Sequence, residues 1–322
     1  MMKKVLGIDI GGTSVKLAAI RENGEIFHQW DILTRGQDEG QAIVPDILAS
    51  IDDFLAKNDF SIDDFLGIGI GTPGTIDRDQ GTVVGAYNLN WKKVQPIRQS
   101  FQAHFPGIPV YLENDANVAA LGEQWLGAGD KNPNMVLVTL GTGVGGGVIV
   151  NDQLVVGSGA AGEIGHMVAN PDGFQCTCGN QGCLETVASA SGIVQTAQAR
   201  AKTADANSSL REQIKNGQAV TTKDIFQAAE AGDIFAESVV EECMGYLGHA
   251  LGQIASVLNP DTIVIGGGVA NAGDYLLDKV KAHYLPHVYP SVRTTTDLKI
   301  ASLGNTAGVI GAGSLVIKNL ME

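Results

Sequence analysis

The sequence predicts an α/β protein of two domains that share one plan. The main observation is a repeated unit of two apolar strands separated by glycines, with strands at 6–10 and 14–20 around Gly11 and strands at 135–140 and 147–150 around Gly141. Placing Gly11 on Gly141 aligns both turns and their flanking strands. A unit that recurs near the start of each half is typical of a duplicated architecture. The 322 residues are enough for two domains with a large buried core.

Helices and strands alternate along the rest of the chain, as an α/β fold requires. The apolar spacing predicts strands at 65–70, 110–113 and 262–265, and helices at 42–57, 114–126, 235–258 and 306–319. Asn259-Pro260 ends the third of these helices, because proline cannot continue it. The polar segment 199–217 is expected to form helix and loop at the surface. The glycine-rich stretch 127–130 is the expected boundary between domains.

Composition excludes several classes of protein. The net charge is 21 − 35 = −14 and the chain has no basic run, so no nucleic-acid partner is expected. The N-terminus lacks an apolar segment of signal-peptide type, and no run of about 18 apolar residues could span a membrane. We therefore expect no membrane partner and a cytoplasmic location. The 42 glycines lie beside short apolar strands and are expected to form tight turns.

The segment 162–185 contains four potential metal ligands: His166, Cys176, Cys178 and Cys183. Three thiolates and one imidazole make a closed tetrahedral set, which is what a structural Zn2+ needs. A disulfide is the less favoured alternative, because Cys-x-Cys spacing suits the restrictive bridge geometry poorly. Burial of the thiols as small apolar side chains is not expected in so glycine-rich a loop. Glu163 and Glu185 are surplus to the metal and are expected to face a ligand.

The fourth cysteine has a different context. Cys243 lies in an apolar helical stretch and is expected to be an inert core thiol. With the other three cysteines assigned to a metal, the cysteine content fits a reducing cytoplasm.

Two glycine turns are candidate phosphate sites. Asp9-Ile10-Gly11-Gly12-Thr13 offers backbone amides where no Cβ blocks a phosphate, and Asp9 could hold Mg2+ through water. The alternative is a plain hairpin turn. Gly141-Thr142-Gly143 begins a second such turn, and the glycines from 141 to 146 match G-x-G-x-x-G. A Rossmann site is nevertheless rejected, because that motif must open a helix and these glycines open a strand. No Walker A lysine follows them.

Two further positions have both a structural and a functional interpretation. Asn114-Asp115 follows a strand and starts a helix, so it is either an N-cap, worth about 1 kcal/mol, or a general base with a substrate-orienting neighbour. Gly266-Gly267-Gly268 follows another strand. It is either a plain strand-to-helix turn or a place where a flat adenosine approaches the backbone.

Together these motifs resemble the ROK family of bacterial sugar kinases, within the actin/hexokinase-like ATPase superfamily. The segment 176–185 matches the family pattern C-x-C-G-x-x-G-C-x-E at every fixed position, and Gly162-Glu163-Ile164-Gly165-His166 matches the sugar-and-zinc segment. The resemblance covers essentially the whole chain. It implies two ribonuclease H-like domains with a zinc-bearing loop. The expected domains are residues 1–127 plus 305–322 and residues 128–304, with the active site in the cleft between them.

The chain is most similar to the ATP-dependent glucokinases of Gram-positive bacteria, which implies transfer of the γ-phosphoryl group of ATP to the 6-hydroxyl of glucose. The implied cofactors are Mg2+ and a structural Zn2+ held by His166, Cys176, Cys178 and Cys183. The implied nucleotide-binding residues are Asp9, Gly11, Gly12, Thr13, Gly141, Thr142, Gly143, Gly266, Gly267, Gly268 and Asn305. The implied sugar-binding residues are Gly74, Asn88, Asn114, Asp115, Glu163, His166 and Glu185, with Asp115 as the catalytic base.

Alternatives remain within and beyond this activity. Other kinases of the family act on N-acetylmannosamine, N-acetylglucosamine, mannose, fructose or allose, and the sequence does not separate these substrates. Kinases that use polyphosphate lack the full cysteine motif. A sugar-sensing regulator would carry a helix-turn-helix domain in front, for which a motif that starts at Asp9 leaves no room. The family also implies a homo-oligomer, either a dimer or a tetramer.

Overall fold

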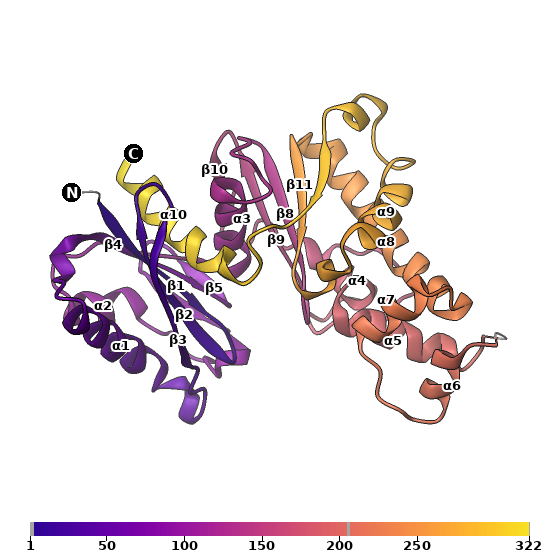
Figure 1. The fold of residues 1–322 in the computed structure, drawn as a ribbon, viewed down its shortest axis with the longest axis horizontal. Helices are drawn as coiled ribbons and strands as arrows, with labels where there is room; N and C mark the ends of the chain where they lie inside the picture. Colours follow the sequence, from indigo (N-terminus) through magenta and orange to yellow (C-terminus); the bar gives the residue numbers. More distant parts are fainter. Residues whose placement is uncertain (1–2, 205–206, 322) are drawn as a thin grey trace.

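The computed structural model describes residues 3–204 and 207–321. Two five-stranded sheets lie side by side in it, with two helices between them and further helices on their outer faces (Figure 1). The two chain ends lie near each other beside the first sheet (Figure 1). None of the helices among these residues has the length and apolar character needed to cross a membrane.

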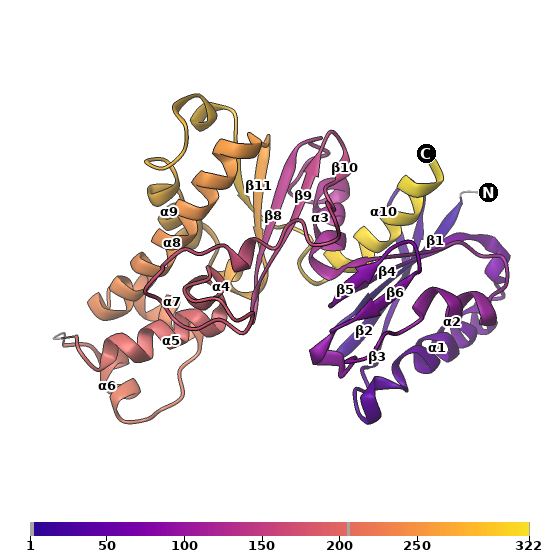
Figure 2. The same cartoon turned by 180° about the vertical axis from the view of Figure 1, so that it is seen from behind.

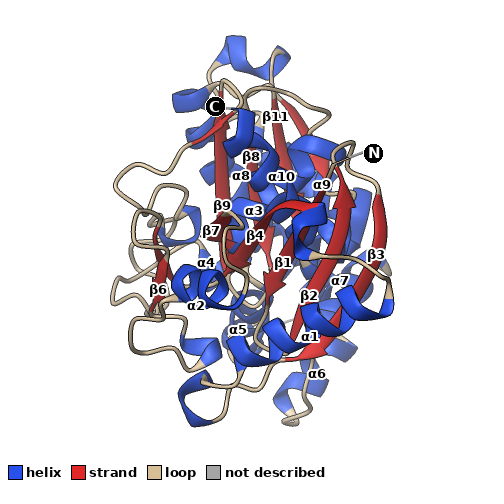
Figure 3. Cartoon of the chain, turned by 90° about the vertical axis from the view of Figure 1, so that its left-hand side faces the viewer, coloured by secondary structure: helices blue, strands red, loops and turns tan. Residues whose placement is uncertain are grey.

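The first sheet has the strand order β3-β2-β1-β4-β7. Its strands are β1 (Lys4–Ile10), β2 (Ser14–Arg21), β3 (Ile26–Leu33), β4 (Phe65–Thr72) and β7 (Val110–Asn114). The first three strands pair antiparallel, whereas β1 pairs with β4 and β4 with β7 in parallel. The outer face is covered by α1 (Ile43–Lys57) and α2 (Ile97–His104), as Figure 3 shows. The small hairpin of β5 (Thr75–Asp77) and β6 (Thr82–Val84) follows β4.

The second sheet repeats this arrangement with the order β10-β9-β8-β11-β12. Its strands are β8 (Met135–Leu140), β9 (Val144–Val150), β10 (Gln153–Leu154), β11 (Thr262–Gly266) and β12 (Asp297–Ile300). The pairings run antiparallel, antiparallel, parallel and parallel, in the same sequence as in the first sheet. The predicted duplication is therefore confirmed. The predicted start of β9 at residue 147 is wrong, because pairing with β8 already begins at Val144.

Helices cover the face of the second sheet that points away from the first sheet (Figure 2). They are α4 (Glu185–Ala188), α5 (Ala190–Ala201), α6 (Ser209–Lys215), α7 (Thr222–Glu230), α8 (Ile234–Leu258) and α9 (Gly273–Tyr284). The segment 199–217 was predicted to mix helix and loop, and it contains the end of α5 and the whole of α6. Residues 205–206 lie outside the described residues. Cys243 is fully buried in α8, and burial raises the pKa of its thiol to about 12. This confirms an inert core thiol.

Two helices fill the space between the sheets. Helix α10 (Ala307–Met321) packs on the first sheet, where Val309 contacts the cluster around Val5. Helix α3 (Asp115–Leu126) packs on the second sheet, where Leu121 contacts the cluster around Leu137. The two helices also pack against each other, so the order of layers is sheet, α10, α3, sheet (Figure 1).

Several glycines serve this packing and not a turn, which corrects the expectation from composition. A Cβ at Gly69 in β4 would lie 1.8 Å from the Ala312 carbonyl oxygen. A Cβ at Gly311 in α10 would lie 1.6 Å from the Val118 carbonyl oxygen in α3. Carbon and oxygen atoms cannot approach so closely, so only glycine allows these contacts.

The chain crosses between the sheets after α3 and again before α10. Glu123 of α3 is 1% exposed and joins both crossings. Its Oε2 accepts hydrogen bonds from the N–H groups of Ala128 (2.8 Å) and Ser302 (3.2 Å), and its Oε1 accepts one from Leu303 (2.9 Å). The expected domain boundaries at 127/128 and 304/305 fall at these crossings and stay a prediction.

Candidate active site

A cavity of about 820 Å³ lies between the two halves of the molecule and contains most of the predicted site residues. Predicted residues that line it are Asp9, Gly11, Gly74, Asn114, Asp115, Gly141, Gly143, Glu163, His166, Glu185, Gly266, Gly267, Gly268 and Asn305. These residues come from both hairpins, the start of α3, the metal-ligand segment and the approach to α10. The fold therefore brings together residues that are almost 300 positions apart in the sequence.

Of the residues predicted to bind nucleotide or sugar, four do not line this cavity: Gly12, Thr13, Asn88 and Thr142. Gly12 and Asn88 are neighbours, because a Cβ on Gly12 would lie 3.5 Å from the Asn88 Cβ. The Thr13 carbonyl accepts a hydrogen bond from Thr34 N–H (3.0 Å), and the Thr142 carbonyl accepts one from the Ser191 hydroxyl (2.7 Å). The backbone carbonyls of both threonines thus stabilise the hairpin tips.

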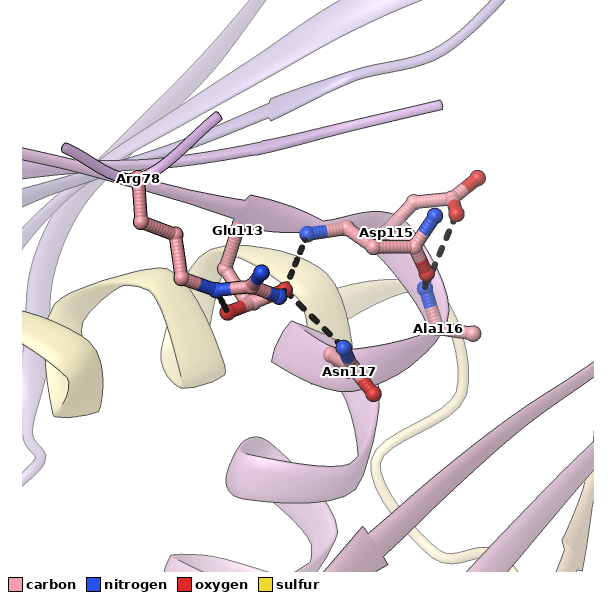
Figure 4. Close-up of polar contacts among 6 residues, drawn as sticks. Arg78, Glu113, Asp115, Ala116 and Asn117 are labelled. Carbon is pink, nitrogen blue, oxygen red and sulfur yellow. Dashed lines mark hydrogen bonds and ion pairs between the residues drawn. The ribbon is translucent and has the colours of Figure 1, made fainter. Parts of the chain in front are cut away.

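The start of α3 presents Asp115 to the cavity. Asn114 is the N-cap, and its Oδ1 accepts a hydrogen bond from Ala116 N–H at 2.9 Å. This confirms the structural interpretation of Asn114 and leaves its functional one open. Asp115 is exposed and lines the cavity. Figure 4 shows its side chain at the start of the helix. The enclosing walls nevertheless desolvate it and raise its pKa, while the hydrogen bond to Ala116 N–H opposes the shift.

Asp9 supplies a second carboxylate close to the base. Burial raises its pKa to about 6; Lys16 opposes the shift and Asp115 adds to it. Lys16 stands opposite Asp9 in the β1–β2 pairing, and its Nζ donates to the Asn305 carbonyl at 3.2 Å. The Asp9 carboxylate also lies against the first turn of α10, since a Cβ on Gly308 would be 2.4 Å from its Oδ2.

Sequence reasoning missed Lys16, which lines the cavity. Its signal was a single cation inside an apolar strand, at the position that faces Asp9 in an antiparallel pair. It also missed Glu113, which is 2% exposed and forms an ion pair with Arg78. No local pattern marks that pair, because its members are 35 residues apart.

The second hairpin is bonded to the segment that carries Glu185. Glu185 Oε2 accepts a hydrogen bond from Val144 N–H at 3.0 Å. A Cβ on Gly143 would lie 2.3 Å from the same oxygen, so glycine is needed for this contact. The Gly141 carbonyl accepts a hydrogen bond from Ala190 N–H at 2.8 Å. A residue predicted to bind sugar thus contacts a loop predicted to bind phosphate.

The next three glycines of this hairpin have a packing role. Cβ atoms on Gly145 and Gly147 would lie 3.0 Å and 2.5 Å from the Cβ atoms of Ala116 and Ala120 in α3, and one on Gly146 would lie 2.5 Å from the Gly162 carbonyl oxygen. Of the three glycines that match G-x-G-x-x-G, only Gly146 packs within the strand; Gly141 and Gly143 precede it in the turn. Rejection of a Rossmann site is confirmed, because Val144 begins β9 and not a helix.

The third glycine motif joins β11 to a short 3-10 helix. Gly267 has φ = +85°, and a Cβ there would lie 2.5 Å from the Leu140 carbonyl oxygen. Gly268 has no atom within 4 Å of its ideal Cβ position among those considered, so its face is open to the cavity. The motif is a strand-to-helix turn that also leaves room for a flat group.

The four metal-ligand residues converge at one point. Their ligand atoms all lie within 4.8 Å of one another. Cys178 Sγ is 3.6 Å from Cys183 Sγ, and Cys176 Sγ is 3.6 Å from His166 Nδ1. Sulfurs bonded tetrahedrally at about 2.3 Å from Zn2+ lie about 3.8 Å apart, so the donors fit that metal.

Two of these thiols correct an expectation. Cys176 and Cys183 are buried, although burial was not expected in a glycine-rich loop, and Cys178 is exposed. The loop folds over them with its own hydrogen bonds, such as Cys176 N–H to the Asn180 carbonyl (2.8 Å). His166 links this cluster to the cavity, since its Nε2 lies 3.8 Å from Glu163 Oε2 and both residues line the cavity.

Comparison with known proteins gives a consistent picture. The pattern of the ROK family matches residues 5–319. The glucokinase of Halalkalibacterium halodurans is 45% identical to this chain over 313 residues, which are 97% of this chain and 94% of the relative.

Two solved structures show the range of functions in this fold. A ROK family glucokinase from Streptomyces griseus, in complex with glucose and AMPPNP, has a TM-score of 0.76 and 32% identity, with 97% of this chain and 98% of that chain covered. A ROK family transcriptional regulator has a TM-score of 0.86 and 26% identity, with 99% of this chain and 79% of that chain covered.

Proposed function

The chain belongs to the ROK family, and from that premise we propose that it is a glucokinase, which transfers the γ-phosphoryl group of ATP to the 6-hydroxyl of glucose. The observation that carries this proposal is the cavity in which one carboxylate at a helix start, Asp115, lies between two glycine hairpins. This arrangement suits phosphoryl transfer, which depends on positioning and on electrostatic stabilisation.

Asp115 acts as the general base in this proposal. A carboxylate beside the 6-hydroxyl accepts its proton as the oxygen attacks the γ-phosphorus. The raised pKa of Asp115 brings its basicity closer to the working pH, and its accessibility within the cavity allows contact with a substrate. Asn114, already fixed as the N-cap, offers its remaining amide hydrogens to the sugar.

The nucleotide lies along the glycine motifs. Backbone amides of Gly12 and Thr13 in the first hairpin, and of Thr142 and Gly143 in the second, donate to the phosphates. The amides of Gly11 and Gly141 donate within the hairpins, to the carbonyls of Ser14 (3.0 Å) and Gly143 (2.9 Å). Asp9 would hold Mg2+, and the metal would offset phosphate charge when bound. Lys16 places a positive charge beside the same carboxylate. The open face at Gly268 and the backbone near Asn305 receive the adenosine.

The sugar is recognised by hydrogen bonds from residues on both sides of the cavity. The proposed contacts are Gly74, Asn88, Asn114, Glu163, His166 and Glu185. Glucose is neutral and rich in hydroxyls, so a site of this kind rejects analogues that leave its buried polar groups unpaired. Because Asn88 lies beside Gly12 and does not line the cavity, its contact requires the two halves to close.

A structural Zn2+ fits the cluster of three cysteines and His166. All four positions of a tetrahedral ion are then taken by protein, so the metal has no open position for chemistry. His166 gives Nδ1 to the cluster and directs Nε2 toward Glu163 and the cavity. The metal thereby orients a sugar-binding imidazole.

The remaining expectations follow from the family and stay part of the proposal. They are the two-domain actin/hexokinase-like architecture, a homo-oligomeric state, a cytoplasmic location and a role in glycolysis. The two sheets of equal strand order support the architecture. Kinases for N-acetylmannosamine, N-acetylglucosamine, mannose, fructose or allose are the alternative enzymes. The similarity to a transcriptional regulator favours a sugar sensor as the second candidate function.

A coupled assay with ATP–Mg2+ and a panel of hexoses and N-acetylhexosamines tests the proposal. A glucokinase prefers glucose by about ten-fold or more in kcat/KM, which corresponds to about 1.4 kcal/mol in transition-state binding. Preference for an N-acetyl sugar would keep the base and the metal but change the substrate. Glucose binding without turnover of any sugar would favour the sensor.

A further inference from the structure

A buried ion pair lies directly behind the proposed base. Arg78 Nε donates to Glu113 Oε2 at 2.6 Å and Arg78 Nη2 donates to Glu113 Oε1 at 2.5 Å, so the contact is bidentate (Figure 4). The Glu113 side chain is 3% exposed and that of Arg78 is 27% exposed. Neither residue lines the cavity. A carboxylate this deeply buried needs its partner, because an unpaired charge there is strongly unfavourable.

The same carboxylate holds the first turn of α3. Glu113 Oε1 accepts hydrogen bonds from the backbone N–H of Asn114 (2.7 Å) and from Nδ2 of Asn117 (2.9 Å). Asn114 precedes Asp115 and Asn117 lies two positions after it, so Glu113 holds one backbone amide and one side chain close to the base. Asn117 lines the cavity, and its Oδ1 is buried without a hydrogen-bond partner in the part of the chain that the structure describes. By holding Nδ2 of Asn117, Glu113 therefore also fixes the direction of the Asn117 Oδ1 acceptor.

The other end of the pair is attached to a second segment that lines the cavity. Arg78 follows β5, whose residues Thr75 and Ile76 line the cavity. Arg98 of α2 fixes this turn, since its Nη2 donates to the Arg78 carbonyl (2.7 Å) and its Nη1 to the Asp79 carbonyl (3.0 Å). The bidentate pair thus joins one wall of the cavity to the helix that carries the base.

We propose that Arg78 and Glu113 are positioning residues that hold Asp115 in line with the acceptor hydroxyl. The proposal rests on the proposed function, because it assumes that Asp115 is the base. A misplacement of about 1 Å at a reacting group can lower a rate about 100-fold. Loss of the pair should therefore lower kcat, while the groups that contact sugar and nucleotide keep their affinity.

A double-mutant cycle with Glu113→Gln and Asp115→Asn tests this role. Glu113→Gln should lower kcat about 10-fold or more, with KM for glucose and ATP changed less than about 3-fold. In the Asp115→Asn background, measured with enzyme in excess, the same substitution should change the rate less than about 2-fold, because the base it positions is absent. Multiplicative losses in the double variant, or a change confined to KM, would overturn the proposal.

Further variants keep the test decisive if Glu113→Gln does not fold. Arg78→Gln then replaces it in the same cycle, and Arg78→Lys should recover part of the lost kcat, since it restores the charge with one contact. Arg200→Gln, which breaks the pair with Glu242 between α5 and α8, is the matched control and should keep wild-type kcat. Absence of turnover in the wild-type protein would overturn the proposed function itself, whereas an additive cycle in an active enzyme would overturn only the positioning role.

Discussion

The two glycine hairpins have the same place in two equivalent sheets, yet different parts of the molecule hold them. Thr34 of the segment after β3 holds the first hairpin, with its hydroxyl on the Gly11 carbonyl (2.6 Å) and its N–H on the Thr13 carbonyl (3.0 Å). Glu185 and Ala190, which follow the metal cluster, hold the second. Among the described residues, only the second hairpin donates a hydrogen bond to a proposed sugar-binding side chain, that of Glu185.

The hairpins also differ in charge. The alignment of Gly11 with Gly141 places Asp9 opposite Thr139, and both residues line the cavity. The first hairpin therefore contributes a carboxylate, which the proposed function assigns to Mg2+, and the second contributes a neutral hydroxyl. Two hairpins of the same backbone arrangement thus have different roles in the proposal. The first places a charged side chain in the cavity, and the second contacts the sugar-binding segment. The predictions below test this division.

The largest effect is expected at the residue that lies between the hairpins. Asp115→Asn should keep the fold and glucose binding but lower kcat at least about 100-fold, because the amide cannot accept the proton. Steady-state kinetics and glucose titration measure the two quantities. Turnover like that of the wild type would show that Asp115 is not the base. The distance from either hairpin to Asp115 would then have no role in catalysis.

Loss of the metal should affect the second hairpin alone. Cys178→Ser should release zinc and weaken glucose binding about 10-fold or more, because Glu185 and His166 lose their support. Metal analysis and calorimetry measure these losses. Cys243→Ser is the matched control, since it removes a buried thiol outside the cluster and should keep both zinc and glucose affinity. Tight glucose binding by a folded, zinc-free Cys178→Ser protein would contradict the prediction.

A smaller change tests the contact between Glu185 and the second hairpin. Gly143→Ala would place a Cβ 2.3 Å from Glu185 Oε2 and displace this carboxylate, so KM for glucose should rise about 10-fold. Gly141→Ala is the contrasting variant, because nothing lies nearer than 3.9 Å to its ideal Cβ position. That substitution should raise KM for ATP without a comparable change in KM for glucose. Equal effects of the two variants on glucose would show that the hairpin responds as a whole.

The sequence was most informative where function and local pattern coincide. The ROK resemblance and the sugar kinase activity are confirmed by the comparisons, and the paired hairpins are confirmed by the two sheets. These features depend on strand periodicity and on consecutive glycines and cysteines, which are visible within short windows. Zinc, the oligomeric state and the roles of individual site residues stay predictions.

Contacts between distant segments could not be predicted in this way. Glu113 and Glu123 look like ordinary surface charges in the sequence, but the fold buries both and bonds them to the distant residues Arg78 and Ser302. Gly69 and Gly311 were expected within a strand and a helix, but their close packing could not be predicted, because the residues that they contact, Ala312 and Val118, are far away in the sequence. At most one partner of each contact carried a local signal, a small or charged residue inside an apolar strand or helix, and nothing local marked its partner.

The smallest effect concerns the carboxylate of the first hairpin and is a dependence on pH. Burial raises the pKa of Asp9 from an ordinary value of 3.8 to about 6. Below pH 4 both the folded and the unfolded chain carry the proton. Between about pH 4 and 6 the unfolded chain has released it while the folded chain keeps it, so Asp9 lowers the free energy of unfolding progressively as the pH rises.

Activity should change in the opposite direction, because Mg2+ requires the ionised carboxylate. We expect kcat/KM to fall about 10-fold between pH 7 and pH 5, with a midpoint near 6. Asp9→Asn should remove this decrease in kcat/KM and leave the pH dependence that belongs to Asp115. It should also raise the melting temperature above pH 6. Thr139→Val, the equivalent change in the second hairpin, should leave the midpoint in place. A midpoint that stays near 6 in Asp9→Asn would assign the decrease to Asp115 and end the distinction in charge between the hairpins.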